Sequence, residues 1–260
     1  MTAPSPVSTG PAGAAGPAER VERLVAWVRD RVAEAGAKGC ICNLSGGLDS
    51  AVVAGLIKRA FPGACLALIL PCHSQPVDRE DAELVARAFD LATETRDLGP
   101  VYDRFLEILG AAGGPEPARG SAEAVARANI KARLRMITVY YEANRRGYLV
   151  VGTGNRSELA MGYFTKYGDG GVDVLPLGNL VKAEVRAIAG ELGVPARVIE
   201  KAPTAGLWPG QTDEGEMGLT YATLDRFLLT GEAEPAVASK IKKRMAGSEH
   251  KRRLPPIAEV

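Results

Sequence analysis

The residues best suited to chemistry in this chain lie in the segment Ser45-Gly46-Gly47-Leu48-Asp49-Ser50. The segment stands between a short apolar run, 40–44, and a helix-like stretch, 51–57. A strand, a tight glycine turn and a helix N-terminus together make a geometry that binds phosphate. Adjacent glycines let backbone N–H groups approach the anion without a Cβ in the way. The segment therefore predicts a phosphate-binding loop.

Asp49 is unusual in such a loop, because a carboxylate repels phosphate unless a divalent cation lies between them. The loop therefore predicts a nucleotide bound together with Mg²⁺. It is not a G-x-x-x-x-G-K-[ST] loop, because it contains no lysine. The structural alternative is a serine- and glycine-rich turn that merely begins a helix.

Alternating strands and helices must position this loop. Strands are expected at 40–44, 66–70, 93–98 and 148–151. Helices are expected at about 21–36, 51–61, 78–89, 101–109, 121–146, 182–192, 195–201, 220–229 and 234–246, with loops at about 110–120 and 202–218. This alternation predicts an α/β fold: a single doubly wound parallel sheet with helices on both faces. Ligands of such sheets bind beyond the carboxyl ends of the strands.

Composition limits the function classes. The chain has 260 residues, 46% of them hydrophobic, and a net charge of +1, which favours neither nucleic acid nor a membrane surface as partner. Residues 1–17 are rich in Ala, Pro and Gly and lack a signal-peptide pattern, so we expect a disordered leader followed by one domain, 18–260. The four cysteines are expected to be reduced, small core residues of a cytoplasmic protein. A zinc site made by Cys40, Cys42 and Cys72-His73 is the less favoured alternative.

A second group of candidates is Gly152-Thr153-Gly154-Asn155-Arg156-Ser157-Glu158, which follows an expected strand and begins a helix. A dinucleotide-binding G-x-G-x-x-G motif would need glycine where Ser157 stands, so NAD(P)-dependent redox chemistry is disfavoured. We instead expect Thr153 near the nucleotide and Glu158 as an oxygen ligand of the Mg²⁺ that Asp49 also binds. An ordinary first-turn glutamate is the alternative for Glu158.

Five further segments carry a family resemblance. The segment 162–173, which contains Phe-Thr-Lys-Tyr-Gly-Asp, is too rich in glycine and charge for a core element. The others are Asn-Ile-Lys-Ala-Arg-Leu-Arg-Met at 129–136, the segments 202–208 and 211–214, and His-Lys-Arg at 250–252. Together with Ser-Gly-Gly-Leu-Asp-Ser they resemble the NAD synthetase family of the ATP pyrophosphatase superfamily. The similarity runs from about Val21 to the C-terminus. One departure is 154–157, where many bacterial relatives carry an Asp-His pair, so contacts of that pair are not transferred.

The resemblance implies that deamido-NAD is adenylated by ATP and then amidated by ammonia, giving NAD, AMP and pyrophosphate. It implies ATP contacts by Asn43, Leu44, Ser45, Gly46, Gly47, Leu48, Asp49, Ser50, Thr153, Lys182 and Thr204. Of these, Asp49, Lys182 and Thr204 are expected to be catalytic, and Asp49 and Glu158 to bind Mg²⁺. It implies deamido-NAD contacts by Arg133, Lys166, Asp173, His250 and Lys251. Because Arg133 and Arg135 lie two residues apart on one helix, only one of them is expected to reach the substrate.

The resemblance further implies a homodimer, with the dinucleotide site near the subunit interface, and a lid formed by 202–218. No nitrilase-type glutaminase domain precedes the loop, so free ammonia or ammonia from a separate glutaminase is expected. Two alternatives stay open. One is another ATP pyrophosphatase, such as a GMP-synthetase-like amidotransferase subunit or a tRNA-modifying enzyme. The other is a non-catalytic nucleotide sensor that kept the fold, although the presence of both Asp49 and Glu158 argues against it.

Overall fold

One parallel sheet organises the molecule. The computed structural model describes residues 15–115, 117–204, 206 and 211–258. Within them the strand order is β3-β2-β1-β4, with β1 at Gly39–Asn43, β2 at Cys65–Ile69, β3 at Thr93–Thr95 and β4 at Tyr148–Val150. The chain crosses from β1 to β2 on one side and reaches β4 on the other, so the order reverses between β1 and β4. Open α/β sheets bind ligands at such a switch point, beyond the carboxyl ends of the strands.

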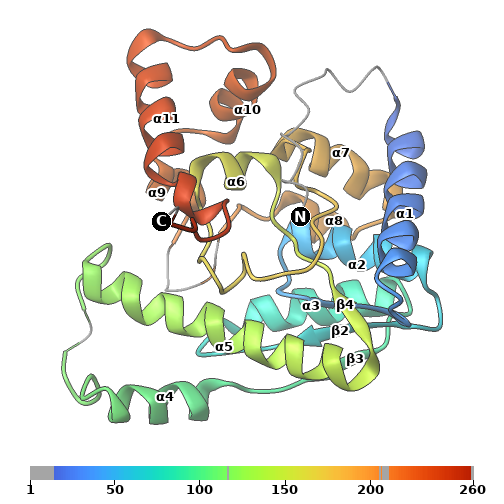
Figure 1. The fold of residues 1–260 in the computed structure, drawn as a ribbon, viewed down its shortest axis with the longest axis horizontal. Coiled ribbons are helices and arrows are strands. Elements are labelled where there is room, and N and C mark those ends of the chain that lie inside the picture. Colours follow the sequence, from blue (N-terminus) through green and yellow to red (C-terminus); the bar gives the residue numbers. More distant parts are fainter. Residues whose placement is uncertain (1–14, 116, 205, 207–210, 259–260) are drawn as a thin grey trace.

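Helices cover both faces of the sheet (Figure 1). One face packs against α1 (Pro17–Glu34), α2 (Leu48–Ala60), α3 (Pro76–Ala88), α7 (Lys182–Leu192) and α8 (Ala196–Glu200). The other packs against α4 (Gly99–Ile108) and α5 (Ala122–Arg146). Side chains alternate along a strand, so Cys40 and Cys42 enter the first core whereas Ile41 enters the second. The doubly wound α/β sheet expected from the sequence is confirmed.

A third, smaller core lies towards the C-terminus. It joins α6 (Arg156–Met161), α9 (Asp213–Met217), α10 (Tyr221–Thr230) and α11 (Pro235–Gly247). Figure 1 shows α10 and α11 standing above α6, away from the sheet. Its fully buried side chains include Met217, Leu224 and Ile241. A short 3-10 helix, Glu249–Lys251, follows α11. No sequence pattern predicted this separate cluster.

Most element boundaries lie within two residues of those expected, and the differences have local causes. Helix α3 begins two residues early, at Pro76, because proline suits the first helical position. The expected loop 202–218 contains α9, whose N-cap Thr212 accepts a hydrogen bond from the backbone N–H of Gly215 (3.3 Å). Residues 205 and 207–210 of the expected lid, and 1–14 of the expected leader, lie outside the described residues. Among the helices described, none combines the length and apolar character needed to cross a bilayer.

Candidate active site

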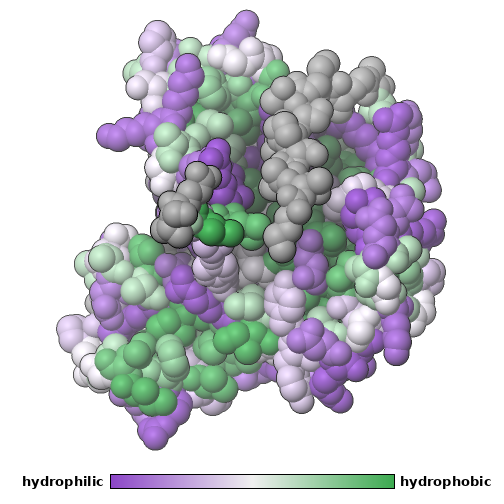
Figure 2. Space-filling model, in the orientation of Figure 1, coloured by the Kyte–Doolittle hydropathy of each residue, from purple (hydrophilic) through white to green (hydrophobic). Residues whose placement is uncertain are grey.

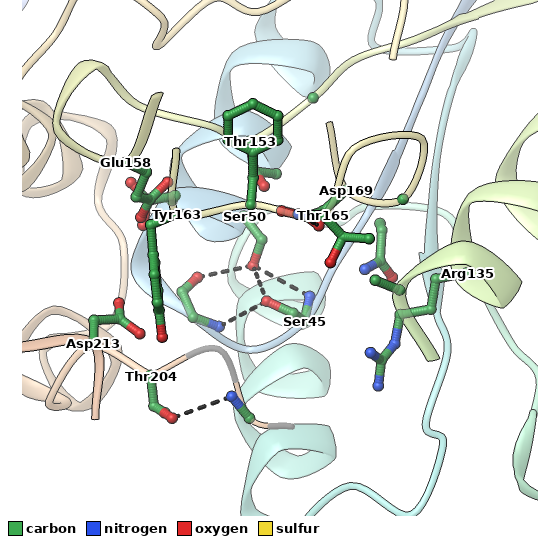
Figure 3. Close-up of a pocket in the computed structure, with 18 of the residues that line it drawn as sticks. Ser45, Ser50, Arg135, Thr153, Glu158, Tyr163, Thr165, Asp169, Thr204 and Asp213 are labelled. Atoms are coloured by element: carbon green, nitrogen blue, oxygen red, sulfur yellow. Dashed lines mark hydrogen bonds between the residues drawn. The ribbon is translucent and has the colours of Figure 1, made fainter. Parts of the chain in front are cut away.

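A cavity of about 660 Å³ lies beyond the carboxyl ends of β1, β2 and β4. It is lined by most of the residues expected to bind ATP: Asn43, Leu44, Ser45, Gly47, Leu48, Asp49, Ser50, Thr153, Lys182 and Thr204. Figure 3 shows Ser45 and Ser50 at its centre, Glu158, Tyr163 and Asp213 on one side, and Arg135 on the other. The switch point of the sheet thus brings together segments that are more than one hundred residues apart in sequence.

The phosphate loop is held in shape by its own hydroxyls. The Ser50 hydroxyl donates to the carbonyl of Gly47 (2.8 Å) and accepts from the backbone N–H of Ser45 (3.2 Å). Within the loop Gly46 has a φ of +83°, and a Cβ there would stand 2.1 Å from the carbonyl oxygen of Asp78. Only glycine tolerates both the left-handed conformation and this contact. Since α2 begins at Leu48, its free N–H groups and positive dipole end point towards the loop.

Three charged side chains meet beside this loop. The Lys182 ammonium contacts the Asp49 carboxylate directly and lies 3.4 Å from Oε1 of Glu158. The other Asp49 oxygen accepts a hydrogen bond from Nδ2 of Asn155 (2.9 Å). Asp49 follows β1, Glu158 follows β4 and Lys182 begins α7. The two carboxylates expected to share Mg²⁺ therefore do converge, with an ammonium between them.

Burial makes these charges interdependent. The side chains of Lys182, Asp49 and Glu158 are only 6%, 14% and 17% exposed. Burial raises the pKa of Glu158, and the charge of Asp49 raises it further, whereas Lys182 opposes both. Burial also disfavours the ammonium form of Lys182, but the neighbouring carboxylates outweigh it and hold its pKa above the usual value. The lysine thus stays charged beside the phosphate loop.

Local structure fixes the positions of Glu158 and Lys182. Asn155 caps α6 by accepting from the backbone N–H of Glu158 (3.0 Å), and Glu158 accepts in return from that of Asn155 (3.2 Å). The N-terminus of α7 is held by a buried pair: Asp225 accepts from the Ser157 hydroxyl (2.6 Å) and from the backbone N–H of Ala183 (2.9 Å). The third core, through α10, therefore orients the helix that carries Lys182.

Of the five residues expected to contact deamido-NAD, one lines the cavity and four do not. Lys251 lines the cavity and donates to the carbonyls of Gly162 and Phe164 (both 2.8 Å). The remaining four do not line it. Asp173 accepts from Tyr140 and from the backbone N–H of Val150, Lys166 donates to the carbonyl of His250, and Arg133 to that of Lys166. Arg135, two residues beyond Arg133, does line the cavity.

Arg135 lies against the end of β2. It donates to the carbonyl of Leu70 (3.0 Å) and to the hydroxyl of Ser74 (3.1 Å), and burial lowers its pKa. The i, i+2 spacing on α5 thus places Arg133 and Arg135 on different sides, as expected. That only one of the two contacts the substrate stays a prediction.

Sequence reasoning gave no role to several residues in or beside the cavity. Asn155, which donates to Asp49, could have been found from its N-x-x-E capping-box spacing. Tyr163, Gln211, Asp213 and Glu216 line the cavity, and their individual places there become visible only in the structure.

The cysteines lie apart from the cavity chemistry. All four are buried and none forms a disulfide. Burial is the largest cause of a raised pKa at each of them, reaching about 12 for Cys42. They behave as core residues, as expected.

Comparison with known proteins identifies the family. The family model described as NAD synthase matches residues 20–255. The chain belongs to the NAD synthase family. It is 51% identical to the NH₃-dependent NAD⁺ synthetase of Carboxydothermus hydrogenoformans, over 92% of this chain and 96% of that one. The resemblance read from the sequence motifs is therefore confirmed, and the alternative ATP pyrophosphatases are not favoured.

Solved structures of the NAD synthase fold agree. The structure of NMN synthetase from Francisella tularensis matches with a TM-score of 0.87 and 38% identity, covering 95% of this chain and all of that one. That of NH₃-dependent NAD synthetase from Campylobacter jejuni matches with a TM-score of 0.75 and 29% identity, at the same coverage. The four-stranded parallel sheet is thus the NAD synthase fold.

Proposed function

We propose that this NAD synthase is an ammonia-dependent ligase that amidates the nicotinic acid carboxylate of deamido-NAD with ATP, the last step of NAD biosynthesis. The observation that carries the proposal is the convergence of Asp49, Glu158 and Lys182 beside the phosphate loop in one cavity. Two carboxylates and a lysine at a phosphate loop suit phosphoryl chemistry at the α-phosphate of a nucleotide.

The reaction takes place in two steps. A carboxylate oxygen of the substrate attacks the α-phosphorus of ATP, and the bond from that phosphorus to the pyrophosphate oxygen breaks. Ammonia then attacks the carbonyl carbon, the bond to the AMP oxygen breaks, and a proton is released. Negative charge spreads over phosphate oxygens in the first step, so the residues of the site must position the reacting atoms and neutralise that charge. Lys182 and the N–H groups of the loop do this. Thr153 and Thr204 line the same cavity and are proposed to contact ATP.

Mg²⁺ is proposed as the cofactor, and the residues fit it. The carboxylates of Asp49 and Glu158 supply hard oxygen donors that face one point, and their two negative charges outnumber the single positive charge of Lys182. The described residues hold no group of three or more His, Cys, Asp or Glu side chains placed to hold a metal ion. Mg²⁺ characteristically takes one or two carboxylates and completes its shell with phosphates and water. When bound, it neutralises phosphate charge; Asp49 and Glu158 would hold it.

A homodimer is proposed because one face is uncovered and apolar. Large apolar side chains are exposed on α4 and α5 at Val101, Phe105, Ile108, Leu109, Val125, Ile137 and Tyr141. Figure 2 shows apolar residues gathered at the lower left, where α4 and α5 lie in Figure 1. Exposed apolar clusters of this kind mark interaction surfaces. Arg133, Ile137 and Tyr141 are four residues apart, so they share one stripe of α5. A second copy on this face would bring Arg133 next to the partner, where a deamido-NAD contact is proposed.

The dimer is tested by an Ile137→Asp variant. We expect light scattering to show a dimer for the unmodified protein and a monomer for the variant. Leu229→Asp, an equally exposed apolar position on α10, is the control and should remain dimeric. A monomeric unmodified protein would contradict the proposal.

Amidation of a nicotinic acid mononucleotide is a second candidate. It is favoured by the higher TM-score to the F. tularensis NMN synthetase, 0.87, than to the C. jejuni enzyme, 0.75. Both substrates carry the same carboxylate, so the chemistry above holds for either. The ratio of kcat/KM for the two nucleotides distinguishes them: we expect it to favour deamido-NAD.

The main experiment combines the protein with ATP, Mg²⁺, deamido-NAD and an ammonium salt. We expect NAD and AMP in equal amounts. ADP in place of AMP, or no turnover with either nucleotide, would overturn the proposed function. Glutamine in place of ammonium should give no product unless a separate glutaminase is added.

A further inference from the structure

A second polar cluster lines the cavity beside the Asp49–Lys182–Glu158 group. The Tyr163 hydroxyl donates to Oε2 of Glu216 (2.6 Å), and Nε2 of Gln211 donates to the same oxygen (3.0 Å). The Tyr221 hydroxyl lies 3.0 Å from Oδ2 of Asp213. The cluster therefore places two carboxylates and the Tyr163 hydroxyl on one wall, contributed by the segment after α6 and by α9, with the buried Tyr221 of α10 bonded to Asp213.

One oxygen of this cluster has no partner. Asp213 is 4% exposed, and no hydrogen-bond donor of the described residues reaches its Oδ1. Figure 3 shows its carboxylate on the cavity wall below Tyr163 and Glu158. A buried carboxylate oxygen without a donor is costly, by about 1–3 kcal/mol or more. The fold retains this cost at a cavity wall, which indicates that a donor outside the chain occupies the position.

The charges around Asp213 define that donor. Within the described part of the chain, neither Asp213 nor Glu216 forms an ion pair with a lysine or arginine side chain, and the nearby Lys182 ammonium already contacts Asp49 and lies 3.4 Å from Glu158. The wall therefore carries two carboxylates that have no ion-pair partner in the described part of the chain. The Tyr163 side chain lies beside them, whereas the Tyr221 ring already faces the Lys182 ammonium (5.1 Å). A small cation with several N–H donors fits such a wall, because carboxylates and hydroxyls accept its hydrogen bonds and ring faces attract its charge.

The cluster adjoins the reacting groups. The Tyr221 hydroxyl, 3.0 Å from Asp213, is also 3.4 Å from Oε1 of Glu158. We propose that Asp213 and Glu216, with the Tyr163 hydroxyl, form the subsite that binds ammonium next to the adenylated carboxylate, and that the Tyr221 hydroxyl, bonded to Asp213, positions its carboxylate. This inference rests on the proposed function, since it assigns a place to the nitrogen substrate of that reaction.

The test compares a charged and an uncharged nitrogen substrate. Ammonium carries a positive charge near neutral pH, whereas hydroxylamine is neutral there and also attacks acyl adenylates. Asp213→Asn keeps the size of the side chain and removes its charge. We expect the KM for ammonium to rise about 10- to 100-fold, the loss of one hydrogen bond between charged groups. The KM for hydroxylamine should change less than about threefold, as should ATP–pyrophosphate exchange with deamido-NAD measured without any nitrogen source.

A second test variant and a control variant keep the test valid even if Asp213→Asn fails to fold. Glu216→Gln should raise the KM for ammonium in the same direction, and it serves if Asp213→Asn does not fold. Glu232→Gln removes the same charge from an exposed position and should leave all three measurements unchanged.

Three outcomes would overturn the subsite. They are an unchanged KM for ammonium in both variants, equal losses with ammonium and hydroxylamine, and loss of pyrophosphate exchange. The last two would assign the cluster to a ribose hydroxyl or to the nucleotide instead. Failure of the proposed function is recognised separately, because the unmodified protein would then show neither exchange nor amidation.

Discussion

Replacing Asp49 by asparagine removes one charge from the centre of the active site. Asparagine keeps the acceptor for Nδ2 of Asn155 but puts an NH₂ group beside the Lys182 ammonium. Losing a hydrogen bond between charged groups costs about 1.5–3 kcal/mol. Breaking a buried ion pair outright costs about 3–5 kcal/mol, but Lys182 retains Glu158 at 3.4 Å. We therefore expect the free energy of unfolding to fall by about 1.5–3 kcal/mol, within what a folded domain tolerates.

The effect on catalysis should be larger than the effect on stability. Removing one preorganised electrostatic contact typically lowers kcat about 100- to 1,000-fold, and Asp49 contacts Lys182 as well as being a proposed ligand of Mg²⁺. ATP–pyrophosphate exchange measures adenylation, and guanidinium unfolding measures stability. Glu142→Gln is the matched control. Glu142 is fully buried, lies 2.6 Å from Arg96 and does not line the cavity, so it should lose stability and keep its exchange rate. Asp49→Asn retaining more than a tenth of the rate would refute the reasoning, as would an equal loss in the control.

Three further predictions follow from single features of the structure. Gly46→Ala places a Cβ 2.1 Å from a backbone carbonyl oxygen at a φ of +83°, so we expect a lower Tm and a raised KM for ATP. Gly190→Ala, whose Cβ meets nothing within 4 Å, should keep the Tm and the KM of the unmodified protein; the same changes in both variants would contradict the packing described. The four buried cysteines have raised pKa values, so a thiol reagent at pH 8 should label them only after unfolding, and rapid labelling of the native protein would count against their burial. The raised pKa of Glu158 means that its carboxyl group is more protonated than usual without metal, so binding of Mg²⁺–ATP should release protons and become tighter as pH rises. Calorimetry in buffers of different ionisation enthalpy measures the number of protons released, and proton uptake would contradict the prediction.

Local patterns predicted the sheet and the residues at its strand ends. The apolar runs at 40–44 and 66–70 are buried on both faces and could only be strands of a covered parallel sheet. Asp49 and Glu158 follow two such strands, so their convergence follows from topology. The same reasoning explains why Thr153 was found: the end of β4 faces the same cavity.

The details that the sequence could not supply depend on distant contacts. Lys182 begins a helix in the sequence, and nothing local shows that its ammonium stands between Asp49 and Glu158, which precede it by 133 and 24 residues. Arg133 and Arg135 have the same local neighbours, and only the packing of α5 on the sheet decides which one faces the cavity. Asp213 lies in a segment whose composition indicates a loop. Its burial and its unpartnered oxygen could not be predicted, because they depend on how α9 and α10 pack in the third core.

The central claim is that the substrate carboxylate is activated by transfer of AMP, and an oxygen label tests it most directly. Deamido-NAD with ¹⁸O in its nicotinic acid carboxylate is converted with ATP, Mg²⁺ and ammonium, and the products are analysed by mass spectrometry. Attack of the carboxylate on the α-phosphorus, followed by amidation, predicts one ¹⁸O atom in the phosphate of AMP and one in the amide of NAD. Label in inorganic phosphate with ADP as the second product, or AMP free of label, would contradict the account.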